Sequence, residues 1–254
     1  MRKRSFALLV LVLAGCGDQR SSDGQKSAAP AHVPAAPAQH CVAGKLLPLG
    51  SARTAYAADA PRGAIAFKRP GGAVVARFGP KNVNDYPTVF GVVGVVLGRD
   101  CAPRWYRVQL PKKPNGATGF VRAPALRVDT VPTRIVVEVA KRRLTLYRMA
   151  RPVLTATVAV GSPSTPTPTG RFYVNQRLIP TDAGGPFGPG AIGISAFSDV
   201  LTGWTQGGPV AIHGTNEPWS IGHAVSNGCI RLPNPILKKL FRVTLAGTPV
   251  IINP

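Results

Sequence analysis

The chain has 254 residues, which is enough for one large domain or two smaller ones. Hydrophobic residues make up 44% of it, which excludes a wholly disordered chain, and 28 glycines and 26 prolines favour turn-rich β structure over helical bundles. With 31 Lys and Arg against 10 Asp and Glu, the formal net charge is +21. Such a charge favours nucleic acid, anionic lipid or an acidic wall polymer as surroundings, and composition does not choose among them.

The first sixteen residues have the pattern of an export signal. Three basic residues at positions 2–4 precede an apolar run over Phe6–Leu13, which is too short to span a bilayer permanently. The sequence LAGC at positions 13–16 resembles a bacterial lipobox, in which the cysteine is acylated after cleavage. We predict a lipoprotein signal peptide over residues 1–15 and lipidation of Cys16, and an ordinary cleaved signal is the alternative.

Residues 16–40 are predicted to form an extended tether. Between Ser27 and Ala38, nine of the twelve residues are alanine or proline, and the stretch has no apolar periodicity from which a core could form. The signal and the tether predict an exported protein, lipid-anchored to the bacterial cell envelope and facing the cell wall. Export argues against nucleic acid as a partner and leaves the membrane, through the lipid, and anionic wall polymers as candidates.

Four cysteines divide into three roles. With Cys16 lipidated, three remain in a compartment that permits disulfides, so one thiol stays free. Cys41 and Cys101 bracket the first folded segment, and pairing them closes a loop of about 60 residues, worth about 4 kcal/mol from chain entropy. We predict this disulfide and a free Cys229, and a disulfide from Cys229 to either partner is the alternative.

Residues 41–128 alternate short β-favouring runs with turns, which predicts a small barrel. The residues around Trp105 and Phe120 resemble the end of a bacterial SH3-like module. This resemblance implies a part that binds or orients against wall material, and a spacer with both aromatic rings in its core is the alternative. The runs are Ala64–Phe67, Val74–Phe78, Val89–Leu97, Trp105–Leu110 and Gly119–Val121.

A second segment begins at residue 132, after a connection over residues 129–131. Alternating runs at Ile135–Val139, Leu144–Tyr147 and Val153–Val160 predict an antiparallel meander. One helix is predicted near the C-terminus, with Asn234 as its N-cap and an apolar stripe at positions 236, 237, 240 and 241. The expected fold is mostly β, a small SH3-like barrel followed by a β-rich domain with one short C-terminal helix.

The chemistry is concentrated in the segment Ala211–Leu232, around His213 and Cys229. A thiol is mostly protonated near neutral pH, and an imidazole beside it can take its proton and return it to a leaving amine. His213 follows an apolar run, so we expect it at a strand end, and the backbone amides of Gly228 and Cys229 are candidates to hold an oxyanion. No metal site or cofactor is predicted, because no second cysteine lies near Cys229.

Two motifs place this segment in a known family. The sequences HGT at positions 213–215 and SNGCIRL at positions 226–232 resemble the signature of L,D-transpeptidases of the YkuD type. Gly161, the sequence TPTG at positions 167–170, Phe172 and the run Gly184–Ser195 are similar to that family's upstream stretch. The resemblance covers residues 132–254 and implies an L,D-transpeptidase catalytic domain there.

The resemblance implies a peptidoglycan L,D-transpeptidase acting on stem tetrapeptides. In that family the cysteine attacks the carbonyl of the third residue, expels terminal D-alanine, and transfers the acyl group to a neighbouring stem as a 3→3 cross-link. Cys229 is then the nucleophile, His213 the base and acid, and the backbone carbonyl of Gly214 orients the histidine. Many members are also inactivated by carbapenems.

The remaining polar residues of the motif are candidates for substrate binding. Arg231 can favour the thiolate or hold a substrate carboxylate. Many family members have histidine where this chain has Asn227, which cannot titrate near neutral pH and is assigned to substrate positioning. Ser226 is expected to contact substrate or shape the turn, and His223 to be an exposed loop residue. The stretch 181–190 is predicted to border the substrate groove, with a plain hairpin loop as the alternative.

Two other functions remain open from the sequence. An L,D-carboxypeptidase uses the same acyl-enzyme, with water in place of the acceptor amine. A lipid-anchored wall-binding protein without catalysis is the second alternative, and the intact set of His213, Gly228, Cys229 and Arg231 argues against it. The acceptor amine, the ligand of the SH3-like segment and the oligomeric state are not specified by the sequence.

Overall fold

The computed structural model describes residues 41–203 and 205–254, so the predicted signal peptide, Cys16 and the tether lie outside the described residues. Within the described part, no helix has the length and apolar character needed to cross a bilayer. Strands dominate and a single α-helix is present among these residues, which confirms the expected mostly β class.

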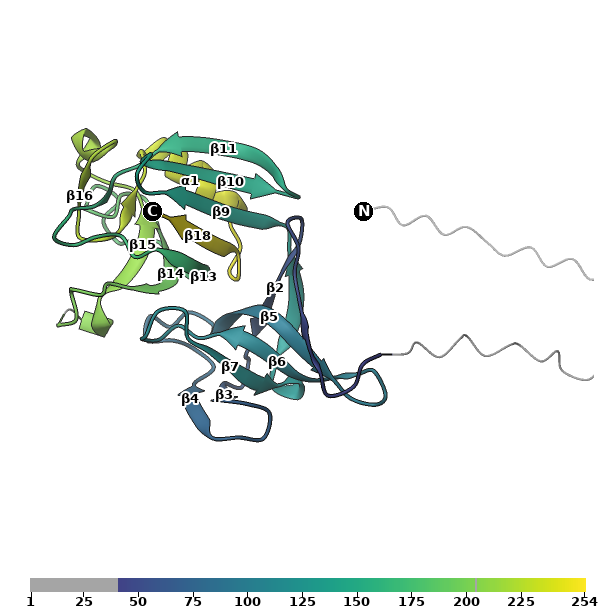
Figure 1. The fold of residues 1–254 in the computed structure, drawn as a ribbon. Coiled ribbons are helices and arrows are strands. Elements are labelled where there is room, and N and C mark those ends of the chain that lie inside the picture. The colour runs from purple at the N-terminus through teal and green to yellow at the C-terminus, as the bar shows by residue number, and fades with distance from the viewer. Residues whose placement is uncertain (1–40, 204) are drawn as a thin grey trace, which may run out of the picture. The chain divides into compact units, whose positions relative to one another are not determined.

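Residues 41–131, the first β unit, form an antiparallel sheet in the order β4-β3-β7-β6-β5-β2-β8, with β1 added to β5 (Figure 1). Three predicted runs have the bounds of strands β3, β4 and β5, and two more overlap β6 and β7. The expected connection at residues 129–131 was wrong, because these residues belong to β8, which pairs with β2. The strands are β1 (Leu46–Pro48), β2 (Ala55–Asp59), β3 (Ala64–Phe67), β4 (Val74–Phe78), β5 (Val89–Leu97), β6 (Pro103–Gln109), β7 (Thr118–Arg122) and β8 (Arg127–Val131).

The first β unit has a core of small residues. In its main buried cluster four of ten residues are alanine, and Phe90 is the largest residue there. Trp105 and Phe120 are half-buried instead of filling this core. A disulfide joins Cys41, before β1, to Cys101, in the turn between β5 and β6.

Residues 132–254, the second β unit, form a second sheet in the order β11-β10-β9-β18-β13-β14-β15-β17. The predicted antiparallel meander of β9, β10 and β11 is confirmed. Within this sheet two strand pairs are parallel, β18 with β9 and β17 with β15. The C-terminal β18 lies between β9 and β13, and its pairing with β13 is antiparallel. The strands are β9 (Thr133–Glu138), β10 (Arg143–Arg148), β11 (Arg151–Thr157), β13 (Gly170–Leu178), β14 (Ala191–Phe197), β15 (Pro209–His213), β17 (Ile230–Arg231) and β18 (Pro249–Asn253), with β12 (Val160–Gly161) and β16 (Ala224–Ser226) forming a separate parallel pair.

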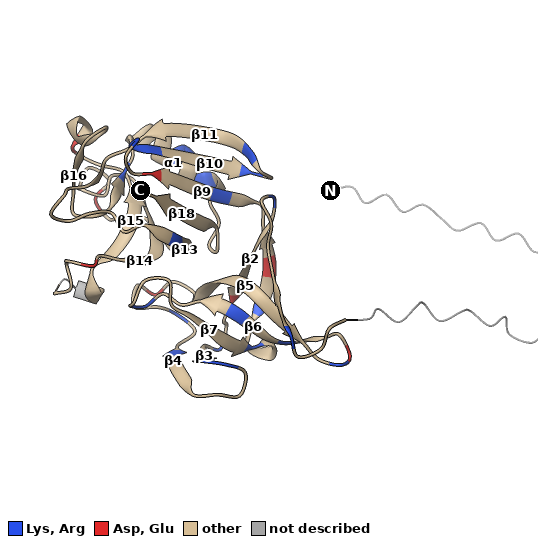
Figure 2. Cartoon of the chain, in the orientation of Figure 1, with Lys and Arg blue, Asp and Glu red and all other residues tan. Residues whose placement is uncertain are grey.

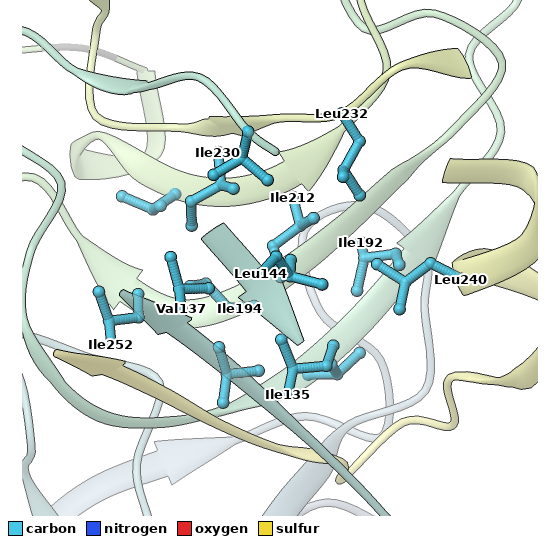
Figure 3. Packing of buried hydrophobic residues seen from close by; sticks show 14 of the residues in the cluster. Ile135, Val137, Leu144, Ile192, Ile194, Ile212, Ile230, Leu232, Leu240 and Ile252 are labelled. Atoms are coloured by element: carbon cyan, nitrogen blue, oxygen red, sulfur yellow. The ribbon is translucent and has the colours of Figure 1, made fainter. Parts of the chain in front are cut away.

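Branched aliphatic side chains fill the interior of the second β unit. Figure 3 shows residues from β9, β10, β14, β15, β17, β18 and α1 (Asn234–Val243) converging there. Leu237 and Leu240 of α1 are fully buried in this cluster, as the apolar stripe predicted. Burying such side chains stabilises the fold by about 1.5–3 kcal/mol each.

The predicted N-cap of the helix was wrong. Pro233 occupies the N-cap position without a side-chain cap bond, and Asn234 is the first helical residue. The side-chain Oδ1 of Asn234 instead accepts a hydrogen bond of 2.8 Å from the backbone amide of Thr215, two residues after His213. The start of the helix therefore holds the segment that follows β15.

The two β units contact each other within one compact unit. Tyr173 of β13 is fully buried, and its hydroxyl donates to the Val89 carbonyl at 3.0 Å. Its ring lies over Gly91 of β5, where a Cβ atom would come within 3.1 Å of the ring, so this close approach requires glycine. Figure 2 shows Lys and Arg spread over both units, with fewer Asp and Glu.

Candidate active site

His213 is the last residue of β15, as expected from the apolar run before it. Only 4% of its surface is exposed. The parallel pairing of β15 with β17 sets Ile212 opposite Ile230 and His213 opposite Arg231. This pairing brings the loop that carries Cys229 against the end of β15, although sixteen positions separate the two residues in the chain.

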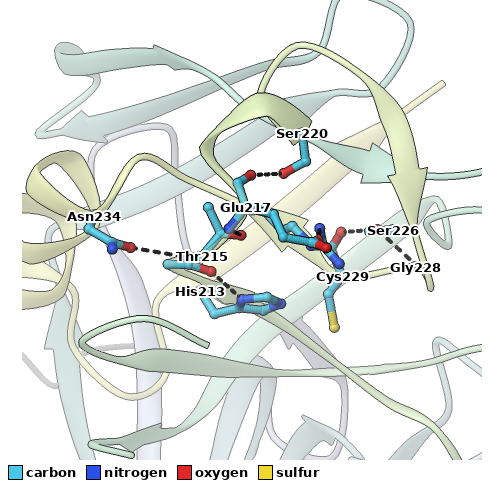
Figure 4. Close-up of polar contacts among 10 residues, drawn as sticks. His213, Thr215, Glu217, Ser220, Ser226, Gly228, Cys229 and Asn234 are labelled. Carbon is cyan, nitrogen blue, oxygen red and sulfur yellow. Dashed lines mark hydrogen bonds and ion pairs between the residues drawn. The ribbon is translucent and has the colours of Figure 1, made fainter. Parts of the chain in front are cut away.

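The Cys229 thiol contacts β15, the strand that carries His213. The backbone amide of Ala211 donates to the Cys229 sulfur at 3.4 Å. Ala211 and His213 are two positions apart on β15, so their side chains point to the same face. Figure 4 shows the thiol and the imidazole projecting to the same side. Among the described residues Cys229 is the free cysteine, and it is half-buried.

A backbone carbonyl fixes the orientation of the imidazole. Nδ1 of His213 lies 2.5 Å from the Gly214 carbonyl oxygen, and a carbonyl only accepts, so Nδ1 carries the proton. Nε2 of the neutral ring is then the basic nitrogen. The Phe187 ring packs edge-on against the imidazole, with the ring centres 4.9 Å apart.

Burial keeps both groups neutral. Burial lowers the pKa of His213 to about 4; the Gly214 hydrogen bond opposes this shift and the charge of Arg231 adds to it. Burial also raises the pKa of the Cys229 thiol, against the effects of the Ala211 hydrogen bond and of Arg231. The free protein therefore holds a protonated thiol and a neutral imidazole.

The loop before Cys229 is held by buried hydroxyls. Ser226 is 1% exposed; its hydroxyl donates to the Cys229 carbonyl at 2.5 Å and accepts from the Gly228 amide at 3.2 Å. Gly228 has φ +102, a conformation that L side chains rarely adopt. The Thr167 hydroxyl of the upstream stretch donates to the Gly228 carbonyl at 3.0 Å and accepts from the Gly161 amide at 2.8 Å.

These contacts bear on two of the expected roles. The Ser226 hydroxyl makes both of its hydrogen bonds within the loop, which favours its role in shaping the turn over contact with substrate. The Gly228 amide is also engaged, by Ser226, and is not free for an oxyanion in this state. Within the described residues the Cys229 amide has no hydrogen-bond acceptor, which leaves it as the candidate oxyanion donor.

Arg231 is held by an acidic residue that the sequence analysis did not single out. Its guanidinium forms an ion pair with the Glu217 carboxylate, and its side chain is 18% exposed. The Glu217 amide is fixed by the Thr215 hydroxyl at 2.9 Å, and its carbonyl by the Ser220 hydroxyl at 2.6 Å (Figure 4). Glu217 is one of only ten acidic residues, and its position near a motif arginine was the available signal.

Other predicted residues lie at the surface. Asn227 and His223 are exposed, so both are free to meet a ligand or solvent. Trp219 is 62% exposed and is not part of the core, whereas Trp204 lies outside the described residues. No group of three or more His, Cys, Asp or Glu side chains close enough to hold a metal ion occurs in the described part of the chain.

A cleft of about 850 Å³ opens onto the sulfur. Phe187, from the loop 181–190, lines it together with Cys229, which confirms that this loop borders the groove. Most of the other lining residues are small or apolar: Leu178, Ile179, Pro180, Ala191, Gly193, Gly203, Pro209, Val210 and Ala211, with Asn84, Gln176 and Gln206 providing amide groups. A cleft of this size can bury a peptide-sized ligand.

Comparison with known proteins agrees with this β-rich fold, in which the Cys229 loop lies against the strand that ends at His213. The family described as YkuD, L,D-transpeptidase catalytic domain, matches residues 132–252. The YkuD proteins of Bacillus licheniformis and Bacillus subtilis, named as L,D-transpeptidases, are each 40% identical to this chain over 126 and 124 residues, covering 68% of either relative. These alignments cover 50% and 49% of this chain. The chain belongs to the YkuD family of L,D-transpeptidases.

Solved structures give a weaker likeness. An Enterococcus faecium L,D-transpeptidase is 26% identical with a TM-score of 0.35, over 47% of this chain and 49% of that one. An L,D-transpeptidase from Mycobacterium smegmatis is 17% identical with a TM-score of 0.38, over 59% and 78% of the two chains.

Proposed function

We propose that the protein is a peptidoglycan L,D-transpeptidase that forms 3→3 cross-links through a cysteinyl acyl-enzyme and releases terminal D-alanine. The observation that carries this is the pairing of β15, which ends at His213, with β17, which begins directly after Cys229, together with the cleft that Cys229 lines. Family membership supports the same reaction class.

The first half-reaction forms the thioester. The Cys229 sulfur attacks the carbonyl of the third stem residue while Nε2 of His213 takes the thiol proton. The Cys229 amide donates to the resulting oxyanion. When the intermediate collapses, the carbon–nitrogen bond to D-alanine breaks, and the leaving nitrogen takes the proton back from Nε2.

The second half-reaction forms the cross-link. An amine of a neighbouring stem attacks the thioester, its proton passes to Nε2 of His213, and the sulfur leaves and is reprotonated. Arg231 is proposed to hold a substrate carboxylate near the sulfur, and Asn227, which is exposed, to position the stem. The Glu217 ion pair fixes Arg231 for that task.

Product analysis tests this function. The full chain is incubated with disaccharide tetrapeptide, and the products are separated and weighed by mass spectrometry, with Cys229→Ala as the control. We expect dimers that lack one D-alanine, formed only by the wild type. Shortened stems without dimers would assign the protein as a carboxypeptidase, and unchanged tetrapeptide would reject both activities.

The anchor and the first β unit are assigned from the sequence. We propose that Cys16 is lipidated, that the enzyme faces the wall from the bacterial cell envelope, and that the first β unit is an SH3-like module contacting wall material. Anionic wall polymers are a further proposed partner, supported by the charge of +21, of which +18 remains once residues 1–15 and their three basic side chains are removed. Metabolic labelling with a fatty acid tests the anchor, because Cys16→Ser should remove the label.

A further inference from the structure

A loop of the first β unit reaches the second one in a fixed conformation. It connects β4 to β5, and within it Asn82 accepts through Oδ1 from the amides of Asn84 and Tyr86, at 2.9 and 3.1 Å. The Asn82 amide also donates to the Tyr86 carbonyl at 2.8 Å. These bonds hold Asn84 at the tip of the loop without help from a ligand.

Both asparagines contact the second β unit at one side chain. The side-chain Oε1 of Gln176, on β13, accepts hydrogen bonds from the side-chain amides of Asn82 and Asn84 at 2.8 and 3.0 Å. Gln176 is 8% exposed. The Gln206 side-chain amide donates to Asn84 Oδ1 at 3.1 Å. Asn84 is therefore fixed between two side chains of the second β unit.

Asn84 and Cys229 line the same cleft. Asn84, Gln176 and Gln206 bound it together with the sulfur and an apolar wall that includes Leu178 and Phe187. The same three amide side chains also line an adjoining cavity of about 380 Å³. A ligand that extends away from the sulfur along this cleft meets a residue of the first β unit.

The free hydrogen-bonding capacity of Asn84 suits a peptide. Its side-chain amide has two donors and its oxygen two acceptor positions, and the contacts with Gln176 and Gln206 use one of each. One donor and one acceptor remain, which match the carbonyl and the amide of a peptide unit. Asn84 is half-buried, so these positions are reachable from the cleft.

We infer that Asn84 is a substrate-positioning residue, by which the first β unit helps to bind the stem peptide that acylates Cys229. This inference rests on the proposed function for the identity of the peptide. It assigns the first β unit a part in the substrate cleft, beyond any contact with wall material.

The matched control is Asn115, a third asparagine that joins the two units. Its side chain donates to the Phe197 carbonyl at 2.7 Å and accepts from the Phe197 amide at 2.9 Å. It is not among the residues that line the cleft. Asn115→Ala therefore weakens the contact between the units without touching the cleft.

The experiment measures peptide binding separately from catalysis. Tetrapeptide stem is titrated calorimetrically into the full chain carrying Cys229→Ala, alone and combined with Asn84→Ala, Asn84→Ser or Asn115→Ala. Losing one or two neutral hydrogen bonds should raise Kd about three- to tenfold for both Asn84 variants and leave the Asn115 variant unchanged. In the wild-type background, Asn84→Ala should raise KM similarly while iodoacetamide alkylates Cys229 at an unchanged rate.

Each outcome decides one of the two proposals. Equal effects of Asn84→Ala and Asn115→Ala, an unchanged Kd in both Asn84 variants, or no saturable binding to Cys229→Ala would overturn the inference. Binding that depends on Asn84, in a protein that makes no product from tetrapeptide, would overturn the proposed function and keep the inference. Slower alkylation of Cys229 in Asn84→Ala would make the effect structural and also overturn it.

Discussion

The two β units have interiors of different kinds. In the main buried cluster of the first unit four of ten residues are alanine, against one of nineteen in the main cluster of the second, which consists mostly of isoleucine, leucine and valine. Alanine buries less apolar surface, so the first unit gains less from the hydrophobic effect. It carries the Cys41–Cys101 disulfide, whereas the second unit keeps Cys229 as a thiol. The chemistry lies in the unit whose packing does not need a cross-link.

The sheets also differ in the direction in which their neighbouring strands run. All strand pairs in the first β unit are antiparallel, whereas the second adds β9–β18 and β15–β17 as parallel pairs. Parallel pairs need long connections. The connection between β15 and β17 contains Glu217, which pairs with Arg231, and Ser226, which bonds to Cys229. The segment that links the two parallel strands therefore also holds residues of the site in place.

Removing the base should have the largest effect. His213→Ala is expected to slow acylation by tetrapeptide about 10²–10⁴-fold, because its imidazole is the proposed acceptor of the thiol proton. Rapid-quench mass spectrometry measures the rate. His223→Ala, an exposed histidine ten positions later, serves as the control and should acylate at the wild-type rate. Equal rates in both variants would remove His213 as the base.

Removing the cross-link tests the contrast between the two interiors. The double variant Cys41→Ser with Cys101→Ser should lower the free energy of unfolding by about 4 kcal/mol, because the unfolded chain regains the freedom of the closed loop. Urea titration followed by fluorescence and circular dichroism measures it. Cys229→Ser should cost far less, and a comparable loss in that variant would contradict the contrast.

The fall of kcat/KM at acidic pH should reflect the burial of the His213 imidazole. Because the pKa of His213 is lowered to about 4 from the usual 6.5, kcat/KM should stay high down to about pH 4. Below pH 6.5 the unfolded chain binds a proton that the folded one excludes, so the free energy of unfolding falls by about 3 kcal/mol between pH 6.5 and 4.

Substitution of the ring isolates this pH dependence. His213→Gln cannot titrate, so the fall in stability between pH 6.5 and 4 should be smaller than in the wild type by the contribution of one histidine. Urea titrations across that range measure the difference. If wild-type kcat/KM fell with a midpoint at pH 6.5, and the wild type and His213→Gln lost the same stability between pH 6.5 and 4, burial would not shift the pKa of His213.

A smaller effect is expected from the hydroxyl that holds the nucleophile loop. Thr167→Val leaves the Gly161 amide without an acceptor and the Gly228 carbonyl without that donor, which should cost about 1–3 kcal/mol of stability. Thr169→Val, at an exposed position two residues later, is the control. Thermal unfolding of both variants measures the difference, and equal midpoints would contradict the assigned role of Thr167.

The sequence predicted the parts of the fold that depend on local pattern. The bounds of β3, β4 and β5 follow from apolar runs between turn signals, and the stripe of α1 follows from helical periodicity. The strands β1, β2 and β8 were not predicted, because their residues give no strong alternation and their pairing partners are distant in the chain. The insertion of β18 between β9 and β13 has no local signature either.

The candidate site divides in the same way. The motifs around His213 and Cys229 marked both residues, and the apolar run before His213 predicted its position at the end of a strand. The partners of Asn234, Glu217 and Asn84 could not be read, because each side chain meets a backbone amide or side chain that topology alone brings near. Asn234 also shows that a residue suited to N-capping can instead accept a hydrogen bond from an amide that the tertiary structure places beside it.

The most direct measurement is the mass of the protein after reaction with tetrapeptide stem. Quenched wild type should carry one acyl group, the mass of the stem less D-alanine, on the peptide that contains Cys229, and Cys229→Ala should carry none. A carbapenem is a second acylating probe that should mark the same residue. An acyl group that persists in Cys229→Ala, or cross-linked product formed by that variant, would contradict the thioester mechanism.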